Sequence, residues 1–298
     1  MLFVNIILPV FILIFCGYLA EKKIGLDFRT LTNCSLYLFT PALVFSSLIR
    51  QTLELSLTLN IFFFMVLYTL SLYLLVRLIA AGTAMSRENS GALVLTTVVM
   101  NVGNFGLPLA YFAFGEQGLH VSVLTFVLFN IPLSTLAIVV AQGGEVPLGK
   151  ALINTFKIPI FHAVALAFLL KAVDLSVPFF VLRAVELLGD AAIPLMLVLL
   201  GMQLARTRLE SQWGFLSLAT IIRLAIAPLI AWAITVLLAI DGTSRNVIIL
   251  QTSTPSAVLP LLYALRFGMR PDLVAGTIFV TTLLSAGSLT IILYLLQG

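Results

Sequence analysis

The sequence predicts an all-helical integral membrane protein, from its composition and from the length and continuity of its apolar runs. Apolar residues make up 61% of the 298 positions and charged residues only 9%, against about one quarter charged in soluble domains. A helix needs about 20 apolar residues to cross a bilayer core, and continuous charge-poor runs of that length follow one another along the chain. The ten predicted spans are 2–20, 31–49, 57–81, 89–113, 118–140, 152–172, 178–204, 214–239, 246–265 and 273–296.

Basic residues are distributed unevenly among the links between these spans. With the N-terminus outside, the links that follow odd-numbered spans hold eleven Lys and Arg residues and the opposite side holds four. Positive residues gather on the cytoplasmic side of membrane proteins. We therefore expect a multi-pass protein of the cytoplasmic (inner) membrane with both termini extracytoplasmic. The lipid bilayer accounts for the net charge of +4, and no nucleic-acid partner is expected.

The two halves of the chain resemble each other around their prolines. Span 4 has Leu-Pro-Leu centred on Pro108 and span 9 has it centred on Pro260, each followed by a tyrosine and a Phe-Gly pair, at an offset of 152 residues. Pro41 in span 2 and Pro194 in span 7 match at an offset of 153. Five spans per half is an odd number, so the halves must be inverted, as in secondary transporters. The predicted organisation is a first five-helix repeat over 1–140, a short cytoplasmic linker over 141–150, and a second, inverted repeat over 151–298.

Spans 4 and 9 are predicted to be broken helices that cross at mid-membrane. Proline removes an amide donor and clashes with the carbonyl four residues earlier, and irregular backbone at membrane depth is tolerated only where protein or water satisfies it. The alternative is a pair of ordinary proline kinks. We expect Pro108 and Pro260 to stand at the first position of each second half-helix, a favourable place for proline.

The predicted crossing has the chemistry of an anion site. Half-helix N-termini carry partial positive charge and unpaired amides, which suit a carboxylate. No acidic residue occurs over 89–115 or 245–271, whereas a cation site would normally need one. We therefore expect a small organic acid anion as the ligand, with no metal and no cofactor. The candidate substrate-binding residues are Asn101, Asn104, Pro108, Gln251, Ser253, Pro255, Ser256 and Pro260.

Three further charged residues are candidates for coupling or gating. Glu186 and Asp190 lie four residues apart in span 7, and intramembrane carboxylates are costly and often functional. For Glu186 we favour an ion pair with Arg183 near the outer interface. Asp190 lies deeper and is a candidate proton-sensitive group. Arg223 in span 8 could steer an anion or pair with Asp190 or Glu186, and the sequence does not decide between these.

At these residues the sequence resembles the auxin efflux carrier family, over the whole chain. Asn101 precedes Pro108 by seven residues, like the asparagine that contacts the substrate carboxylate in the N-x6-P-L segment of the plant carriers. Pro255 and Pro260 match that family's P-x4-P segment, and Asp190 falls in a similar D-A…L-G seventh span. The chain departs from the family in having Ile158-Pro159 where Asn-Pro is common, and in its short central loop.

The resemblance implies a mechanism and a substrate class. Spans 1, 2, 6 and 7 would form a scaffold, through which a homodimer could form, and spans 3–5 and 8–10 would form a mobile transport unit. Bacterial relatives are associated with dicarboxylates such as malate or malonate. The expected function is secondary transport of small carboxylates, in the export direction, by an elevator-type mechanism.

Other functional classes use the same elements or are disfavoured by the sequence. An anion channel, a membrane sensor or receptor, and a proton-coupled dicarboxylate symporter remain alternatives. An enzyme is not expected, because the His-Glu-x-x-His, Gly-x-Ser-x-Gly and phosphate-binding glycine motifs do not occur.

Overall fold

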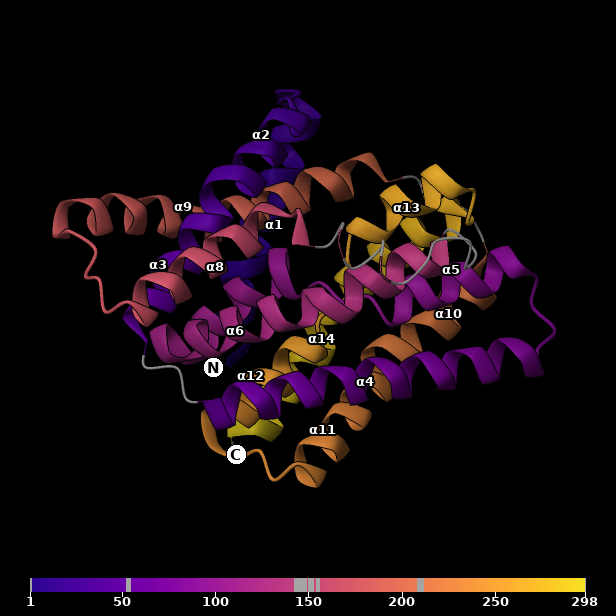
Figure 1. Ribbon diagram of the computed structural model, residues 1–298. Coiled ribbons are helices and arrows are strands. Elements are labelled where there is room, and N and C mark those ends of the chain that lie inside the picture. Colours follow the sequence, from indigo (N-terminus) through magenta and orange to yellow (C-terminus); the bar gives the residue numbers. More distant parts are fainter. Residues whose placement is uncertain are drawn as a thin grey trace.

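Helices make up the fold of this chain. The computed structural model describes residues 2–51, 55–141, 149, 153, 156–207 and 212–297. Within these ranges the chain forms helices joined by short links, with one isolated antiparallel bridge between two links, so the all-helical class is confirmed (Figure 1). The helices are η1 (Phe3–Ile7), α1 (Leu8–Lys23), α2 (Phe28–Cys34), η2 (Ser35–Phe39), α3 (Thr40–Arg50), α4 (Leu55–Gly82), α5 (Arg87–Thr97), η3 (Val102–Gly106), α6 (Leu107–Ala141), α8 (Pro159–Ala172), α9 (Phe179–Arg206), α10 (Trp213–Ile221), η4 (Ile222–Ile226), α11 (Ala227–Leu237), α12 (Gly242–Thr252), α13 (Leu259–Phe267) and α14 (Pro271–Gln297).

Seven helical stretches of the described residues are long and apolar enough to cross a membrane, so the chain is a multi-pass membrane protein. They coincide with predicted spans 1, 2, 3, 7, 8 and 10 and with Val102–Pro132, which joins the second part of span 4 to span 5. The other predicted spans correspond to shorter helices: α5 and α12 have 11 residues each, α8 has 14 and α13 has 9. Most of the predicted linker 141–150 lies outside the described residues.

Wide helical turns precede four of the prolines. Each of the five-residue π-helical segments η1, η2, η3 and η4 is followed directly by a residue–proline pair, with the prolines at Pro9, Pro41, Pro108 and Pro228. A proline ring crowds the carbonyl four residues earlier and offers it no N–H. A π-helical turn, with hydrogen bonds between residues i and i+5, makes room for the ring and keeps the helix continuous. These four prolines therefore lie within continuing helical structure and do not end it.

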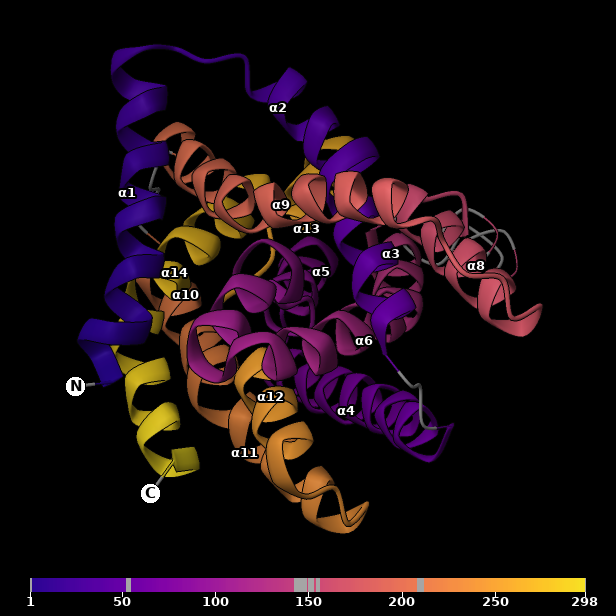
Figure 2. The ribbon, with the colours of Figure 1, turned by 90° about the vertical axis from the view of Figure 1, so that its left-hand side faces the viewer.

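The helices fall into two groups in space. In Figure 2, α1 lies at the left, α2 at the top and α8 at the right, and α9 runs across the upper half towards α3 and α8. Helices α4, α11 and α12 lie below, with α6 between α3 and α4. An apolar core cluster joins the groups, since Leu119 and Val123 of α6 belong to the same cluster as Ile160 of α8 and Met196 of α9. The two ends of the chain lie near each other in both views (Figures 1 and 2).

Helices α1 and α9 approach each other at two glycines. A Cβ atom on Gly17 would overlap the backbone of Val198, and a Cβ atom on Gly201 would overlap the carbonyl oxygen of Ile14. Small residues allow helix backbones in a membrane to pack this closely. The sequence therefore permits this α1–α9 contact only because both positions lack a side chain.

We expect Gly201→Ala to destabilise the protein, because the new methyl group forces α1 away from α9. Overpacking of this kind costs about 1–3 kcal/mol. Thermal unfolding of the purified protein measures the effect. Gly287→Ala in α14 is the matched control, because a Cβ atom there meets nothing within 4 Å. Equal unfolding midpoints for the two variants would contradict this packing.

Candidate functional site

Helices α5 and α12 end side by side near the centre of the fold, and the links that follow them cross there. Helix α5 ends at Thr97 and α12 ends at Thr252. Beyond these ends the two links pair as extended backbone: the Asn101 N–H donates to the Pro255 carbonyl at 2.9 Å, and the Ala257 N–H donates to the Val99 carbonyl at 2.9 Å. Met100 and Ser256 form the antiparallel bridge. Each crossing link thus satisfies backbone groups of the other.

Local sequence explains why α12 stops. Hydroxyl groups at the end of α12 bond to backbone carbonyls, with Ser253 Oγ donating to the Ile249 oxygen at 2.6 Å. Such bonds compete with helix continuation, and Pro255 has no N–H to extend it. After the break α13 begins at Leu259, so Pro260 lies in its first turn, one position later than predicted.

The expectation for Pro108 is wrong in one respect. Helical structure restarts earlier, at η3, where Asn101 occupies the N-cap position and the Gly106 N–H donates to the Asn101 carbonyl at 2.9 Å. Pro108 therefore lies inside the resumed helix, because the π-helical turn accommodates its ring. The helix start at the crossing belongs to the glycine- and asparagine-containing segment η3.

Arg223 of η4 binds the ends of both interrupted helices. Its side chain is 0% exposed. Its guanidinium donates to the Thr97 carbonyl at 2.7 Å, to the Thr252 carbonyl, and to the Tyr68 hydroxyl at 2.9 Å. Tyr68, on α4, in turn donates to the Thr252 carbonyl at 3.1 Å. A helix C-terminus carries about half a negative charge, so the single positive charge of Arg223 balances two of them.

Three buried side-chain atoms at the crossing have no hydrogen-bond partner among the described residues: Nε of Arg223, the Asn101 amide nitrogen and the Gln251 amide oxygen. Asn101 is 5% exposed. Gln251 is held in place because its amide nitrogen donates to the Ser122 carbonyl at 3.2 Å and to the Ser122 hydroxyl. Buried polar groups are almost always paired, so two unpaired donors and an unpaired acceptor here are unusual.

The remaining predicted site residues surround Asn101 and Gln251 or support the crossing. The backbone of Gly106 approaches Gln251, since a Cβ atom on Gly106 would lie 3.4 Å from the Gln251 amide nitrogen. Ser256 is committed to structure, with its hydroxyl donating to the Thr96 carbonyl at 2.5 Å and its N–H donating to the Thr281 hydroxyl at 3.2 Å. The other members are buried except for half-buried Asn104; they are Pro108, Ser253, Pro255 and Pro260.

The predicted partners of the charged residues are corrected by the structure. Glu186 pairs with Arg50 of α3 and not with Arg183, which is exposed. Asp190 is exposed on α9. None of the ion pairs found among the described residues includes Arg223, which removes one of its two alternatives, the pairing with Asp190 or Glu186. The charged residues of α9 thus belong to a different part of the molecule from the crossing.

Sequence reasoning missed three residues that hold the crossing: Tyr68 of α4, Ser122 of α6 and Thr281 of α14. Each is a polar residue inside an otherwise apolar span. Because a polar group in a membrane helix needs a bonding partner, its presence was the available signal. The sequence does not identify the partner of each polar residue, because the packing of helices far apart in the sequence determines it.

The crossing can accept negative charge. The C-terminal ends of α5 and α12 are neutralised by Arg223, while the starts of η3 and α13 keep the partial positive charge of helix N-termini. An unpaired amide donor stands at the first of these starts. A carboxylate oxygen is an acceptor that this donor could bind, with a bond strengthened by the charge.

Comparison with known proteins identifies the family. A model of the membrane transport protein family matches residues 2–147 and 145–293. An uncharacterised transporter of Methanocaldococcus jannaschii is 28% identical over 300 residues, covering 94% of both chains. A candidate malonate transporter of Rhizobium meliloti is 28% identical over 316 residues, covering 99% of this chain and 96% of its own. A candidate auxin efflux carrier component of rice (Oryza sativa subsp. japonica) is 24% identical over 127 residues, 42% of this chain and 21% of its own. The family and these relatives are transporters and not enzymes, and this chain belongs to the membrane transport protein family, that of the auxin efflux carriers.

Proposed function

We propose that this protein is a secondary transporter of small organic anions and that the crossing of the two interrupted helices is its binding site. The observation that carries the proposal is the unpaired, buried amide donor of Asn101 at the start of η3. It lies beside a second helix start in a region without acidic residues. Gln251 supplies an unpaired acceptor, which suits a hydroxyl or a protonated carboxyl group on the same ligand.

Arg223 supports an anion as the ligand, and argues against a cation at the same place. Two helix C-termini that meet inside a membrane protein form a natural cation site, because their carbonyls point at the same volume. Here the guanidinium of Arg223 already bonds to carbonyls at both ends. The charge left for a ligand to balance is then the positive charge of the two helix starts.

The arrangement of polar contacts supports a two-part transporter. Within the predicted scaffold, Arg50 of α3 pairs with Glu186 of α9, and Arg206 of α9 pairs with Glu21 of α1 at 2.7 Å. The contacts of Arg223 and Gln251 stay within the predicted transport unit, on α4, α5, α6 and α12. Between the two groups lies the apolar cluster described above. Apolar contacts impose little directional constraint, so one group could slide along the other.

From this division we infer ten spans in two inverted five-helix repeats, 1–140 and 151–298, with an elevator-type movement of spans 3–5 and 8–10. The crossing is almost fully buried, and an anion could reach it only if surrounding elements move. We place the protein in the cytoplasmic membrane with both termini outside and with a homodimer forming through the scaffold. Small dicarboxylates are the proposed substrates, exported from the cell, and the relative named for malonate transport supports this class.

Counterflow in proteoliposomes tests the proposed function. We expect uptake of labelled malonate to saturate and to be accelerated by unlabelled malonate inside, because a carrier returns faster when loaded. The neutral malonamide should not compete. Uptake that never saturates would indicate an anion channel, and saturable binding without flux would indicate a sensor.

Proton-coupled symport is the second candidate, because Asp190 places an exposed carboxylate in a membrane-crossing helix. An inward proton gradient would then drive malonate accumulation, and Asp190→Asn would remove the drive while leaving counterflow intact. Malonate accumulation that does not respond to the proton gradient in either the wild type or Asp190→Asn would exclude this alternative.

A further inference from the structure

A hollow with basic walls lies at the opposite end of α5 from the crossing, where the end of α4 meets the start of α5. Its volume is about 290 Å³. Two of its lining residues carry guanidinium groups, and three others are apolar. The lining consists of Arg77, Ala80, Ala81, Met85, Arg87 and Ser90.

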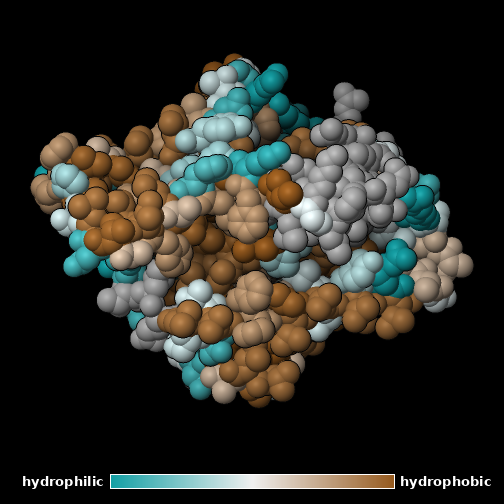
Figure 3. Space-filling model, in the orientation of Figure 1, coloured by the Kyte–Doolittle hydropathy of each residue, from teal (hydrophilic) through white to brown (hydrophobic). Residues whose placement is uncertain are grey.

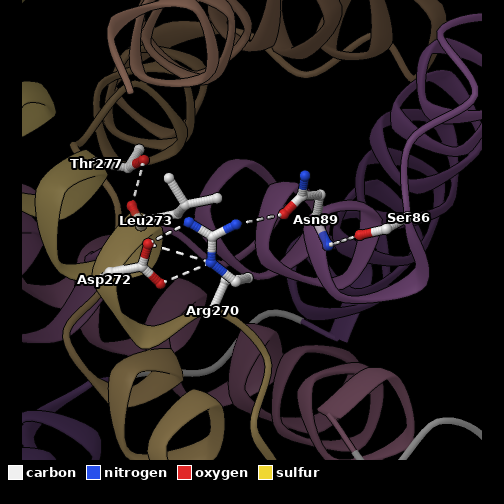
Figure 4. A network of polar contacts seen from close by, with 6 residues as sticks. All are labelled: Ser86, Asn89, Arg270, Asp272, Leu273 and Thr277. Carbon is white, nitrogen blue, oxygen red and sulfur yellow. Dashed lines mark hydrogen bonds and ion pairs between the residues drawn. The ribbon is translucent and has the colours of Figure 1, made fainter. Parts of the chain in front are cut away.

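The walls of this hollow are held in place by hydrogen bonds. Arg77 of α4 donates to the Ser90 hydroxyl of α5 at 3.3 Å. Ser86 caps α5 by accepting from the Asn89 N–H at 3.2 Å, and Arg270 donates to the Asn89 side-chain oxygen at 3.1 Å (Figure 4). Arg270 also pairs with Asp272 at the start of α14. The start of α5 is therefore fixed against both α4 and α14.

Two acids lie near the hollow, and neither lines it. The carboxylate of Glu88 accepts from its own backbone N–H and from the Ser86 hydroxyl, and these bonds, together with the charges of Arg87 and Arg270, lower its pKa. Asp272 is occupied by Arg270. No carboxylate is among the residues that line the hollow, so its charged groups are the two guanidinium ions.

The hollow stands at the end of an apolar stripe on α4. Exposed apolar side chains follow one another at helical spacing and continue to Leu78, one turn before the helix ends at Gly82. From Leu55 to Leu78 is 23 residues, about 35 Å at 1.5 Å per residue, close to the roughly 30 Å of a bilayer core. Figure 3 shows the face over α4 and α11 as largely hydrophobic. The stripe consists of Leu55, Leu59, Phe63, Leu67, Leu70, Leu74 and Leu78.

We propose that this hollow binds the phosphate of an anionic phospholipid, with an acyl chain lying along the α4 stripe. Two observations coincide: a basic, concave end and a continuous apolar path of membrane length leading to it. Arginine binds phosphate oxygens through two parallel N–H groups. The ligand chemistry is a phosphate ester, and the adjoining stripe assigns it to a lipid and not to a free anion.

Lipid binding to the purified, full-length protein tests this proposal. Native mass spectrometry in detergent counts bound phosphatidylglycerol on the folded protein alone. The two arginines would donate charge-assisted hydrogen bonds to the phosphate, so Arg77→Gln with Arg87→Gln should weaken binding by about tenfold or more. The double variant Lys22→Gln with Lys23→Gln, at the end of α1, removes the same charge and should bind as the wild type does.

Three results would overturn the proposal: unchanged phosphatidylglycerol binding in the arginine variant, equal loss in the lysine control, or inorganic phosphate that competes as strongly as the lipid. If Arg77→Gln with Arg87→Gln fails to fold, Arg77→Lys with Arg87→Lys replaces it as the test variant. It keeps the charge and loses the paired donors, so we expect several-fold weaker binding, and unchanged affinity would contradict the assignment.

Discussion

Replacing Arg223 with glutamine is expected to lower both the stability of the protein and its affinity for an organic anion. The change removes a positive charge that bonds to the carbonyls of Thr97 and Thr252. Hydrogen bonds to charged groups contribute about 1.5–3 kcal/mol each, so the two together account for about 3 kcal/mol or more. Thermal unfolding and malonate titration of the purified protein measure the two effects.

Charge and geometry can be separated at this position. Arg223→Lys keeps the charge but presents one ammonium group where the structure needs a fork that reaches two carbonyls. We expect it to recover part of the anion affinity and less of the stability. Arg183→Gln, which removes an exposed arginine from α9, is the control and should change neither quantity. An Arg223→Gln protein that unfolds and binds like the wild type would show that the two helix ends need no counter-charge.

Asn101→Asp is expected to abolish binding of the organic anion. The substitution keeps the size of the side chain and replaces a donor with a negative charge. Asn101→Ala, which removes only the donor, should weaken binding about tenfold or more, because a charge-assisted hydrogen bond contributes roughly 1.5–3 kcal/mol. Equilibrium binding of labelled malonate measures both.

Asn33→Asp on α2 makes the same chemical change at an exposed position in the predicted scaffold. It should leave malonate binding unchanged, because no part of the crossing comes from α2. Equal loss of binding in Asn33→Asp and Asn101→Asp would indicate a general effect of added negative charge, and full binding in Asn101→Asp would remove Asn101 from the anion site.

The helix breaks were predictable because their causes are local. Asn101 in one span, and Ser253 and Pro255 in the other, lie in the interrupted stretches and disfavour continued helix. Gly103 and Gly106, in contrast, lie in the resumed segment η3. The starting point of the resumed helix was not predicted, because a π-helical turn can absorb a proline such as Pro108. That outcome depends on how neighbouring helices pack.

The partners of charged residues could not be derived from the sequence. Helical spacing favours a contact of Glu186 with Arg183, one turn away, yet the structure places Arg50 of another helix beside it. Arg223 donates hydrogen bonds to main-chain carbonyls and does not pair with an acid. A long basic side chain can reach several helices. A backbone carbonyl as its partner cannot be predicted from the sequence, because every residue has one.

The most direct test of the anion site is a structure of the protein soaked with bromomalonate, in which anomalous scattering locates the bromine. We expect a peak at the crossing, with a carboxylate oxygen within hydrogen-bond distance of the Asn101 amide nitrogen and beside the starts of η3 and α13. Saturable malonate binding together with a bromine peak only elsewhere, for example at Arg77 and Arg87, would contradict it.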